Sequence, residues 1–310
     1  MTKEQIIHWL LEGDVSIQYQ TYRDLLDQDK PRLRNKINSE GWGLKFLSKR
    51  HKNAYWGQSF YQPKWISTHY TLLDLKNLNI SSTNKLIKES VQKIFNTEKG
   101  PDGGIRPIGQ NQKCDVCING MVLNYSTYFG IKEELLCSVI DFLLNEKMKD
   151  GGFNCRSNST GAIHSSLHTT LSVLEGIFEY HKNGYTYRLN ELLEVQQEAH
   201  EFILMHKLFR SDKTGEIINP NFLKLYYPSR WYYDVLKALD YFQYAKIKYD
   251  HRMDDAIEFL QSKKTKEGVW KLPSKHPGQT HFEMEQAGKP SRWNTLRALR
   301  VLKYFNIPDV

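Results

Sequence analysis

The sequence predicts an all-α protein built as an (α/α)6 toroid, a double ring of six inner and six outer helices around a central cavity. Three observations predict this fold class. Six Leu-rich segments share one pattern, one-sided amphipathic helices lie between them, and a glycine motif follows these amphipathic helices. No long strand-like alternation and no linker interrupts the pattern, so we expect residues 1–310 to form a single domain.

The six Leu-rich segments are the expected inner helices. Each starts with a polar or aromatic cluster and continues with leucines at helical spacing, and the centres lie roughly fifty to sixty-five residues apart. Leu171 and Leu174 in the fourth segment correspond to Leu236 and Leu239 in the fifth. In chain order the segments are SIQYQTYRDLL, STHYTLLDLKNL, CINGMVLNYSTYF, SLHTTLSVLEGIF, RWYYDVLKALDYF and RWNTLRALRVLKYF.

The expected outer helices carry a single apolar stripe and end at a glycine turn. In KLIKESVQKIF the apolar residues fall on one face while the lysines face away. The turn is itself a motif, because Ile94-Phe95-x3-Lys99-x3-Gly103-x-Ile105 recurs in register as Phe142-Leu143-x3-Lys147-x3-Gly151-x-Phe153. A third copy runs from Phe259 to Trp270. We expect positive φ at these glycines, since a turn after a helix often needs it.

Composition narrows the classes of function. The 310 residues include 43 Lys and Arg against 35 Asp and Glu, a formal charge of +8, and 40% are hydrophobic, which is typical of a globular protein. The basic residues are spread over the outer helices, so we expect no nucleic-acid partner. The chain lacks the run of about 18 apolar residues that a membrane span needs, and it starts without a signal-peptide pattern, so we expect a cytoplasmic protein. Four cysteines are too few for a disulfide framework and indicate reduced thiols or metal ligands.

These patterns resemble a known superfamily. The glycine motif is similar to the QW motif of squalene and oxidosqualene cyclases, with lysines at 99, 147 and 264 where those enzymes have Gln. The segment GGIRPIGQNQKCDVCINGM resembles the zinc-binding stretch of protein prenyltransferase β subunits, in which Asp-x-Cys opens an inner helix. SLHTTLSVLEGI resembles their His-Thr stretch. The resemblance implies an α/α toroid related to prenyltransferases and terpenoid cyclases, which acts on an isoprenoid or other small apolar substrate.

The same resemblance implies a zinc site. Carried over residue by residue, the Zn²⁺ ligands are Asp115, Cys117 and His168. Three protein ligands and an open fourth position are typical of catalytic zinc, which could hold a substrate thiol as thiolate. The residues leave an alternative open, because Cys114, Cys117, Cys155 and His168 could instead form a closed structural site. The cysteines could also be ordinary reduced core residues.

Further candidates come from the starts of the inner helices. The aromatic residues there are expected to line the cavity, where rings accommodate an apolar chain and stabilise developing cations. Among them we single out Tyr232 as a candidate catalytic residue, with Asp234 as a polar group that orients the substrate and His164 as a general base. The aromatic set is Trp65, His69, Tyr70, Trp231, Tyr232, Tyr233 and Trp293.

Two departures from the superfamily limit the mechanism. No DxDD motif is present, so protonation-initiated cyclisation of the squalene type is not expected. Protein prenyltransferases hold the substrate diphosphate with three side chains that form a clamp. The corresponding positions in this chain are Gly109, Gln112 and Ile118, and none of them matches the clamp. Whether the chain is an enzyme therefore stays open, and the alternative is a non-catalytic toroid that binds a ligand or peptide and carries a structural zinc site.

Overall fold

The regular elements of the computed structural model are helices throughout the residues it describes, 1–107, 113–156 and 160–308. Pairing of extended residues in these ranges is confined to isolated bridges, such as Lys99 with Ile105 and Arg210 with Ile217. The predicted all-α class is therefore confirmed.

The chain divides into two compact units, and each is described by itself. Unit 1 comprises Met1–Lys49, Asn77–Ser81 and His206–Val310, and unit 2 comprises Arg50–Lys76 and Ser82–Met205. The six-membered ring and the single domain remain predictions of the sequence.

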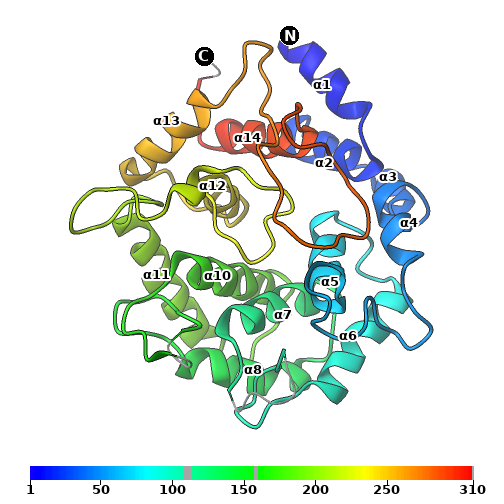
Figure 1. Ribbon diagram of the computed structural model, residues 1–310, viewed down its shortest axis with the longest axis vertical. Helices are drawn as coiled ribbons and strands as arrows, with labels where there is room; N and C mark the ends of the chain where they lie inside the picture. Colours follow the sequence, from blue (N-terminus) through cyan, green and yellow to red (C-terminus); the bar gives the residue numbers. More distant parts are fainter. Residues whose placement is uncertain (108–112, 157–159, 309–310) are drawn as a thin grey trace. The chain divides into compact units, whose positions relative to one another are not determined.

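Figure 1 labels the helices along the chain. The α-helices of unit 1 are α1 (Lys3–Leu11), α2 (Val15–Leu25), α3 (Pro31–Lys36), α4 (Gly41–Leu47), α12 (Val235–Tyr244), α13 (Asp254–Ser262) and α14 (Arg292–Tyr304). Those of unit 2 are α5 (Thr68–Asn77, whose last residue belongs to unit 1), α6 (Lys85–Thr97), α7 (Val116–Tyr128), α8 (Glu133–Asn145), α10 (Leu167–Lys182) and α11 (Leu189–Met205). Short 3-10 helices are η1 (Lys64–Ile66), η2 (Pro220–Leu223) and η3 (His251–Met253).

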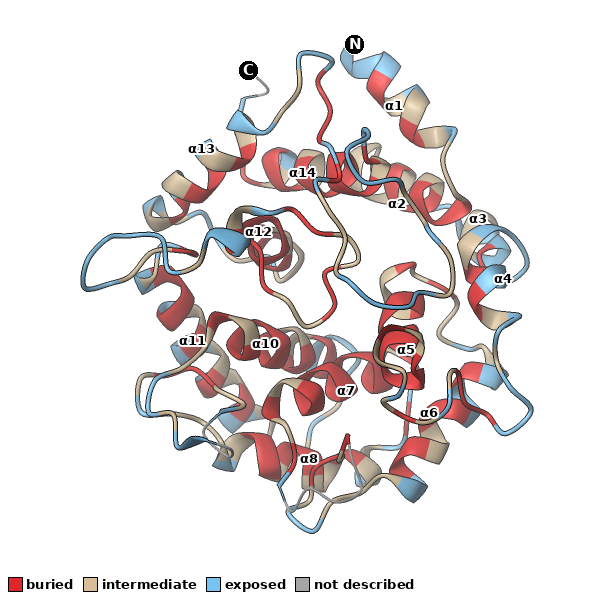
Figure 2. Ribbon diagram, in the orientation of Figure 1, coloured by how far each residue is buried: buried red, intermediate tan, exposed pale blue. Residues whose placement is uncertain are grey.

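The helices of unit 2 are of two kinds, which differ in burial (Figure 2). α7 buries every residue from Ile118 to Thr127, and α5 buries every residue from Thr68 to Leu75. By contrast, α6 buries one stripe, made of Ile87, Ser90, Val91, Ile94 and Phe95. The Leu-rich segments are thus the buried helices of this unit, and the amphipathic segments between them keep one face in solvent, as their periodicity predicts.

The glycine motif has the same backbone in its three in-register copies. Gly103, Gly151 and Gly268 have φ of 90°, 89° and 87°, in the left-handed region that favours glycine. In the first copy the bridge between Lys99 and Ile105 closes the turn. The expected positive φ is confirmed.

α7 and α10 lie side by side in unit 2 and meet through two glycines (Figure 1). A Cβ added at Gly176 would lie 2.5 Å from the carbonyl oxygen of Gly120, and one added at Gly120 would lie 2.7 Å from the carbonyl oxygen of Ser172. Both obstacles are backbone atoms, which cannot rotate away as a side chain can. The two helices can therefore pack at this distance only with glycine at both positions.

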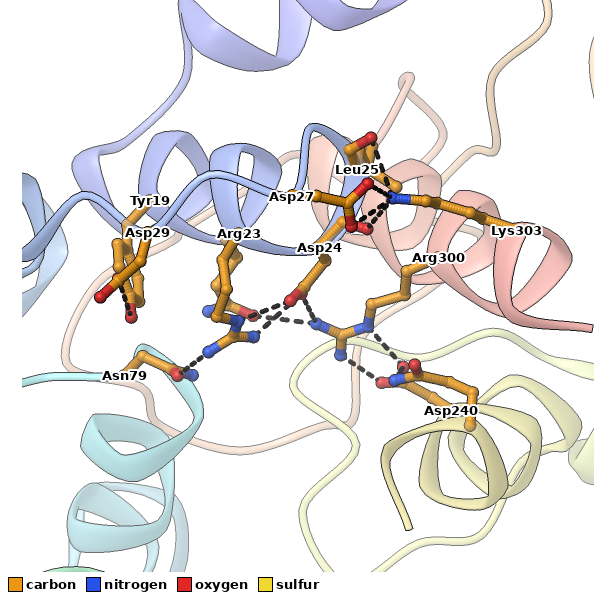
Figure 3. Close-up of polar contacts among 12 residues, drawn as sticks. Tyr19, Arg23, Asp24, Leu25, Asp27, Asp29, Asn79, Asp240, Arg300 and Lys303 are labelled. Atoms are coloured by element: carbon orange, nitrogen blue, oxygen red, sulfur yellow. Dashed lines mark hydrogen bonds and ion pairs between the residues drawn. The ribbon is translucent and has the colours of Figure 1, made fainter. Parts of the chain in front are cut away.

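A half-buried network of ion pairs connects α2, α12 and α14 in unit 1 (Figure 3). Arg300 contacts Asp24 Oδ2 at 2.9 Å through Nη1 and both carboxylate oxygens of Asp240 at 2.5 Å. Arg23 pairs with Asp24, and Arg297 Nε lies 3.1 Å from Asp240. Burial by itself raises the pKa of Asp24 and of Asp240, but the arginines outweigh it and hold both pKa values below the usual range. Both aspartates therefore stay charged.

We expect Gly176→Ala to destabilise the protein because the new methyl group forces α7 and α10 apart. The cost of overpacking is about 1–3 kcal/mol in the free energy of unfolding, even though alanine is the better helix former. Urea denaturation checks this. The control is Gln197→Ala on the exposed face of α11, which we expect to change the free energy by less than about 0.5 kcal/mol. Equal stability of the two variants would contradict the argument.

Candidate functional site

Two cysteines meet where α7 and α10 begin. Cys117 is the second residue of α7, and its backbone N–H donates to Cys155 Sγ at 2.9 Å. The Thr169 hydroxyl in the first turn of α10 lies 3.6 Å from the same sulfur, and Cys117 and Cys155 are close enough that each shifts the pKa of the other. We call Cys117 and Cys155 the thiol pair. Cys155 Sγ therefore faces one hydrogen-bond donor from the first turn of α7 and one from the first turn of α10.

The thiol pair lies among ionisable groups of the same unit. The hydrogen bond between the thiols raises the pKa of Cys117 and lowers the pKa of Cys155, so a thiolate on the pair resides on Cys155. Burial raises the pKa of Asp115, the residue before α7, and the charge of Lys64 opposes this rise. Burial also lowers the pKa of Lys64 and raises that of Tyr61, whose hydroxyl lies 3.1 Å from that of Tyr70. The site thus combines thiols, a carboxylate, an ammonium and a phenol.

The predicted zinc ligands are only partly brought together. Asp115 is close enough to Cys117 and Cys155 to act on the pKa of both, and His168 is the half-buried second residue of α10. Cys114 is buried, with its thiol against Gly100 and its N–H donating to Asp102. Throughout the described part of the chain, no three His, Cys, Asp or Glu side chains are arranged so that they could hold a metal ion. Both zinc-ligand sets therefore remain predictions of the sequence.

The candidate base His164 is a surface residue of unit 2. It lies exposed in the segment before α10, and its carbonyl oxygen accepts a hydrogen bond from Asn154 Nδ2 at 2.8 Å. The other two candidate catalytic residues, Tyr232 and Asp234, belong to unit 1.

Tyr232 is part of a stack of four aromatic rings in unit 1. Its ring centroid lies 4.0 Å from that of Trp231 and 3.8 Å from that of His276, which in turn lies 4.1 Å from Tyr226. Trp231, Tyr232 and His276 are half-buried, and Tyr226 is buried. We call these four residues the aromatic stack. Its rings come from the segment before α12 and, for His276, from the segment before α14.

Asp234 follows the aromatic stack and caps α12. Its Oδ1 accepts the Lys237 N–H at 2.8 Å, whereas its Oδ2 is buried without a hydrogen-bond partner among the described residues. Burial raises the pKa of this carboxyl to about 6, opposed by the nearby charge of Arg297. Asn294, buried in α14, donates to the carbonyl oxygens of Leu225 and Lys271, while its own Oδ1 is also unpartnered. Asp234 can therefore carry or release a proton near neutral pH.

The other predicted aromatic residues are buried in the core of their units. These are Trp65, His69, Tyr70, Tyr233 and Trp293. His69 lies 3.3 Å from the Tyr125 hydroxyl, and burial lowers its pKa to about 3, which keeps it neutral. Of the three positions compared with the diphosphate clamp, Ile118 is buried in α7, and Gly109 and Gln112 lie outside the described residues.

Three residues beside the thiol pair and Asp234 could not be recognised as functional from the sequence. Tyr61 and Lys64 precede α5 in a segment without helical periodicity, where no motif marks them. Arg297 stands within the regular spacing of α14, which indicates a helix and gives no sign that the side chain reaches a half-buried carboxylate.

No protein-family model matches the chain, and a search of curated proteins finds no relative with significant similarity. Within the described ranges, no helix is both long enough and apolar enough to cross a membrane.

We expect the protonated Asp234 carboxyl to contribute stability that is lost as pH rises from about 4 through about 6. The folded chain holds the Asp234 proton with a pKa of about 6 against 3.8 for an ordinary aspartate, so ionisation favours unfolding across this window. The difference corresponds to about 3 kcal/mol. Urea denaturation at pH 4 to 7 should show this contribution as the difference between the unaltered protein and Asp234→Asn, which keeps the acceptor for Lys237, because other groups such as His69 impose their own pH dependence equally on both proteins.

The matched control is Glu216→Gln, which neutralises an exposed carboxyl of the same unit and should retain the full pH dependence. If Asp234→Asn and Glu216→Gln show the same dependence of stability on pH, Asp234 has the pKa of an ordinary aspartate. The proton-carrying role is then rejected.

Proposed function

We propose that this protein is a prenyltransferase- and terpenoid-cyclase-like α/α toroid that takes an isoprenoid or other small apolar substrate. The single observation that carries the proposal is the aromatic stack before α12, whose rings are stacked face to face and remain partly accessible. Aromatic faces bind apolar chains by contact and attract cationic carbon through their quadrupole.

Asp234 supports a chemical role beside this surface. A buried carboxyl with a pKa of about 6 exists in both protonation states near neutral pH, which suits proton transfer to or from a polar group of the substrate. The arginines of the half-buried network hold the nearby carboxylates ionised, so Asp234 differs from Asp240 in the same unit. In the proposed reaction Asp234 moves the proton and the aromatic stack orients the apolar chain.

We expect the protein to bind farnesol saturably. The binding is measured by the quenching of tryptophan fluorescence. Tyr232→Ala removes the central contact between Trp231 and His276, so affinity should fall roughly tenfold, which corresponds to about 1.4 kcal/mol. Tyr232→Phe keeps the ring and should bind nearly as the unaltered protein does. Dodecanol, an unbranched chain, serves as the comparison ligand.

The control variant is Tyr249→Ala, which removes an exposed tyrosine of the same unit outside the aromatic stack. Equal affinity of Tyr232→Ala and the unaltered protein for farnesol would sink the proposed binding surface. Mass spectrometry of products from farnesyl diphosphate then separates the two classes of function. Product formation supports an enzyme, and binding without any product supports the alternative of a binding module.

We also propose that this protein binds zinc, as its resemblance to protein prenyltransferase β subunits implies. The proposed ligands are Asp115, Cys117 and His168. Binding of the ion would draw the three side chains into coordination distance. Metal analysis of the purified protein should give about one zinc per chain, and His168→Ala should lose it. His164→Ala, four residues away and in neither ligand set, is the matched control.

Absence of zinc from the unaltered protein rejects both ligand sets. If zinc is present, cobalt substitution distinguishes them, because the intensity of the thiolate-to-metal absorption should correspond to one thiolate for Asp115, Cys117 and His168. Three thiolates would instead support the closed set that includes Cys114 and Cys155.

A further inference from the structure

We propose that Cys117 and Cys155 form a reversible disulfide by exchange with a low-molecular-weight disulfide such as oxidised glutathione. The proposal concerns the thiol pair of unit 2 and does not depend on the substrate proposed for the aromatic stack.

Cys155 Sγ lies against the backbone of Cys117, 2.9 Å from its nitrogen. A sulfur this close to the backbone of the other cysteine is within reach of its side chain, so side-chain rotation can bring the two sulfurs to bonding distance. Thr169 fixes the other side of Cys155, because its hydroxyl accepts the Cys155 N–H at 3.3 Å and lies 3.6 Å from its sulfur. The segment that carries Cys155 is therefore held against the start of α7.

The thiol pair is also more exposed than the buried Cys114. Cys117 and Cys155 are both partly exposed, so a small disulfide can reach the pair. Cys114 is buried, with its sulfur packed against Gly100. Cys137 lies on α8, where its sulfur is directed to the carbonyl oxygen of Glu133 at 3.5 Å. The structure thus selects one pair out of the four cysteines, and it is not the CxxC pair of the sequence.

The chemistry balances in two exchange steps. One thiol of the pair, as thiolate, attacks glutathione disulfide, which forms a mixed disulfide and releases one glutathione thiolate that takes up the proton. The other thiol of the pair then attacks the protein sulfur of the mixed disulfide and releases the second glutathione. Two protein thiols are oxidised and one glutathione disulfide is reduced to two thiols. Whichever sulfur attacks first, its neighbour is the resolving thiol.

A disulfide here has a consequence for the site. It would join the first turn of α7 to the segment before α10 and withdraw both sulfurs from any metal or substrate. Reduction would restore them. The pair is therefore a modification site that can switch the thiol chemistry of unit 2 on and off.

The test uses the full chain, treated with a chelator so that bound metal does not shield the sulfurs. The protein is incubated with oxidised glutathione, free thiols are blocked with N-ethylmaleimide, and tryptic peptides are mapped by mass spectrometry. Cys114 and Cys117 share tryptic peptide 114–132, and Cys155 lies in peptide 150–156. We expect a cross-link between these two peptides, reversed by dithiothreitol, with fragmentation showing Cys114 alkylated.

Three variants make the result decisive. Cys114→Ser should keep the cross-link, and Cys137→Ser should be indistinguishable from the unaltered protein. Cys155→Ser should give no cross-link and leave glutathione attached to Cys117. A linkage from Cys114 to Cys117 within peptide 114–132, or stable glutathione on both Cys117 and Cys155 of the unaltered protein, would overturn the proposal. Neither outcome bears on farnesol binding, so failure here and failure of the proposed function are distinguishable.

Discussion

The backbone contact between Gly120 and Gly176 is the constraint on which the geometry of unit 2 depends. Because a Cβ at Gly176 would lie 2.5 Å from a carbonyl oxygen of α7, glycine alone permits the two helices to pack this closely. Their first turns then converge, which brings the Cys117 N–H and the Thr169 hydroxyl to one sulfur of Cys155. The chemistry of the thiol pair thus depends on two residues outside it, Gly120 within one turn of Cys117 and Gly176 about two turns after Thr169, neither of which has a side chain.

In unit 1 the environment, rather than the residue type, decides what an aspartate does. Desolvation acts to raise the pKa of both Asp240 and Asp234, yet two arginines hold the pKa of Asp240 below its usual value, while that of Asp234 stays raised at about 6. Arg297 contacts Asp240 directly and influences Asp234 only through its charge. One aspartate is therefore a permanent anion that binds helices together, and the other is free to exchange a proton.

The sequence predicted the helices and their burial well because both follow from local periodicity. The glycine motif also predicted positive φ at Gly103, Gly151 and Gly268, since a single residue type marks that backbone conformation. The partners of the cysteines were not predictable in this way. The sequence left it open whether Cys117 acts with Asp115 and His168 or with Cys114, Cys155 and His168, and it gave no sign that the sulfur of Cys114 lies against Gly100 while that of Cys155 accepts the Cys117 N–H. Contacts between segments far apart depend on helix packing, which no local pattern records.

The discontinuous composition of unit 1 imposes an order on folding during synthesis. Asp24 is made early, whereas its partner Arg300 belongs to the last helix and follows it by 276 residues. Unit 2 is complete in the chain before α12 and α14 exist. Until α14 is made, Asp24 has only its neighbour Arg23 as an ion-pair partner, and the apolar faces of the first helices lack the helices that later cover them. The ion pairs between α2 and α14 therefore form only after all of unit 2 has been synthesised.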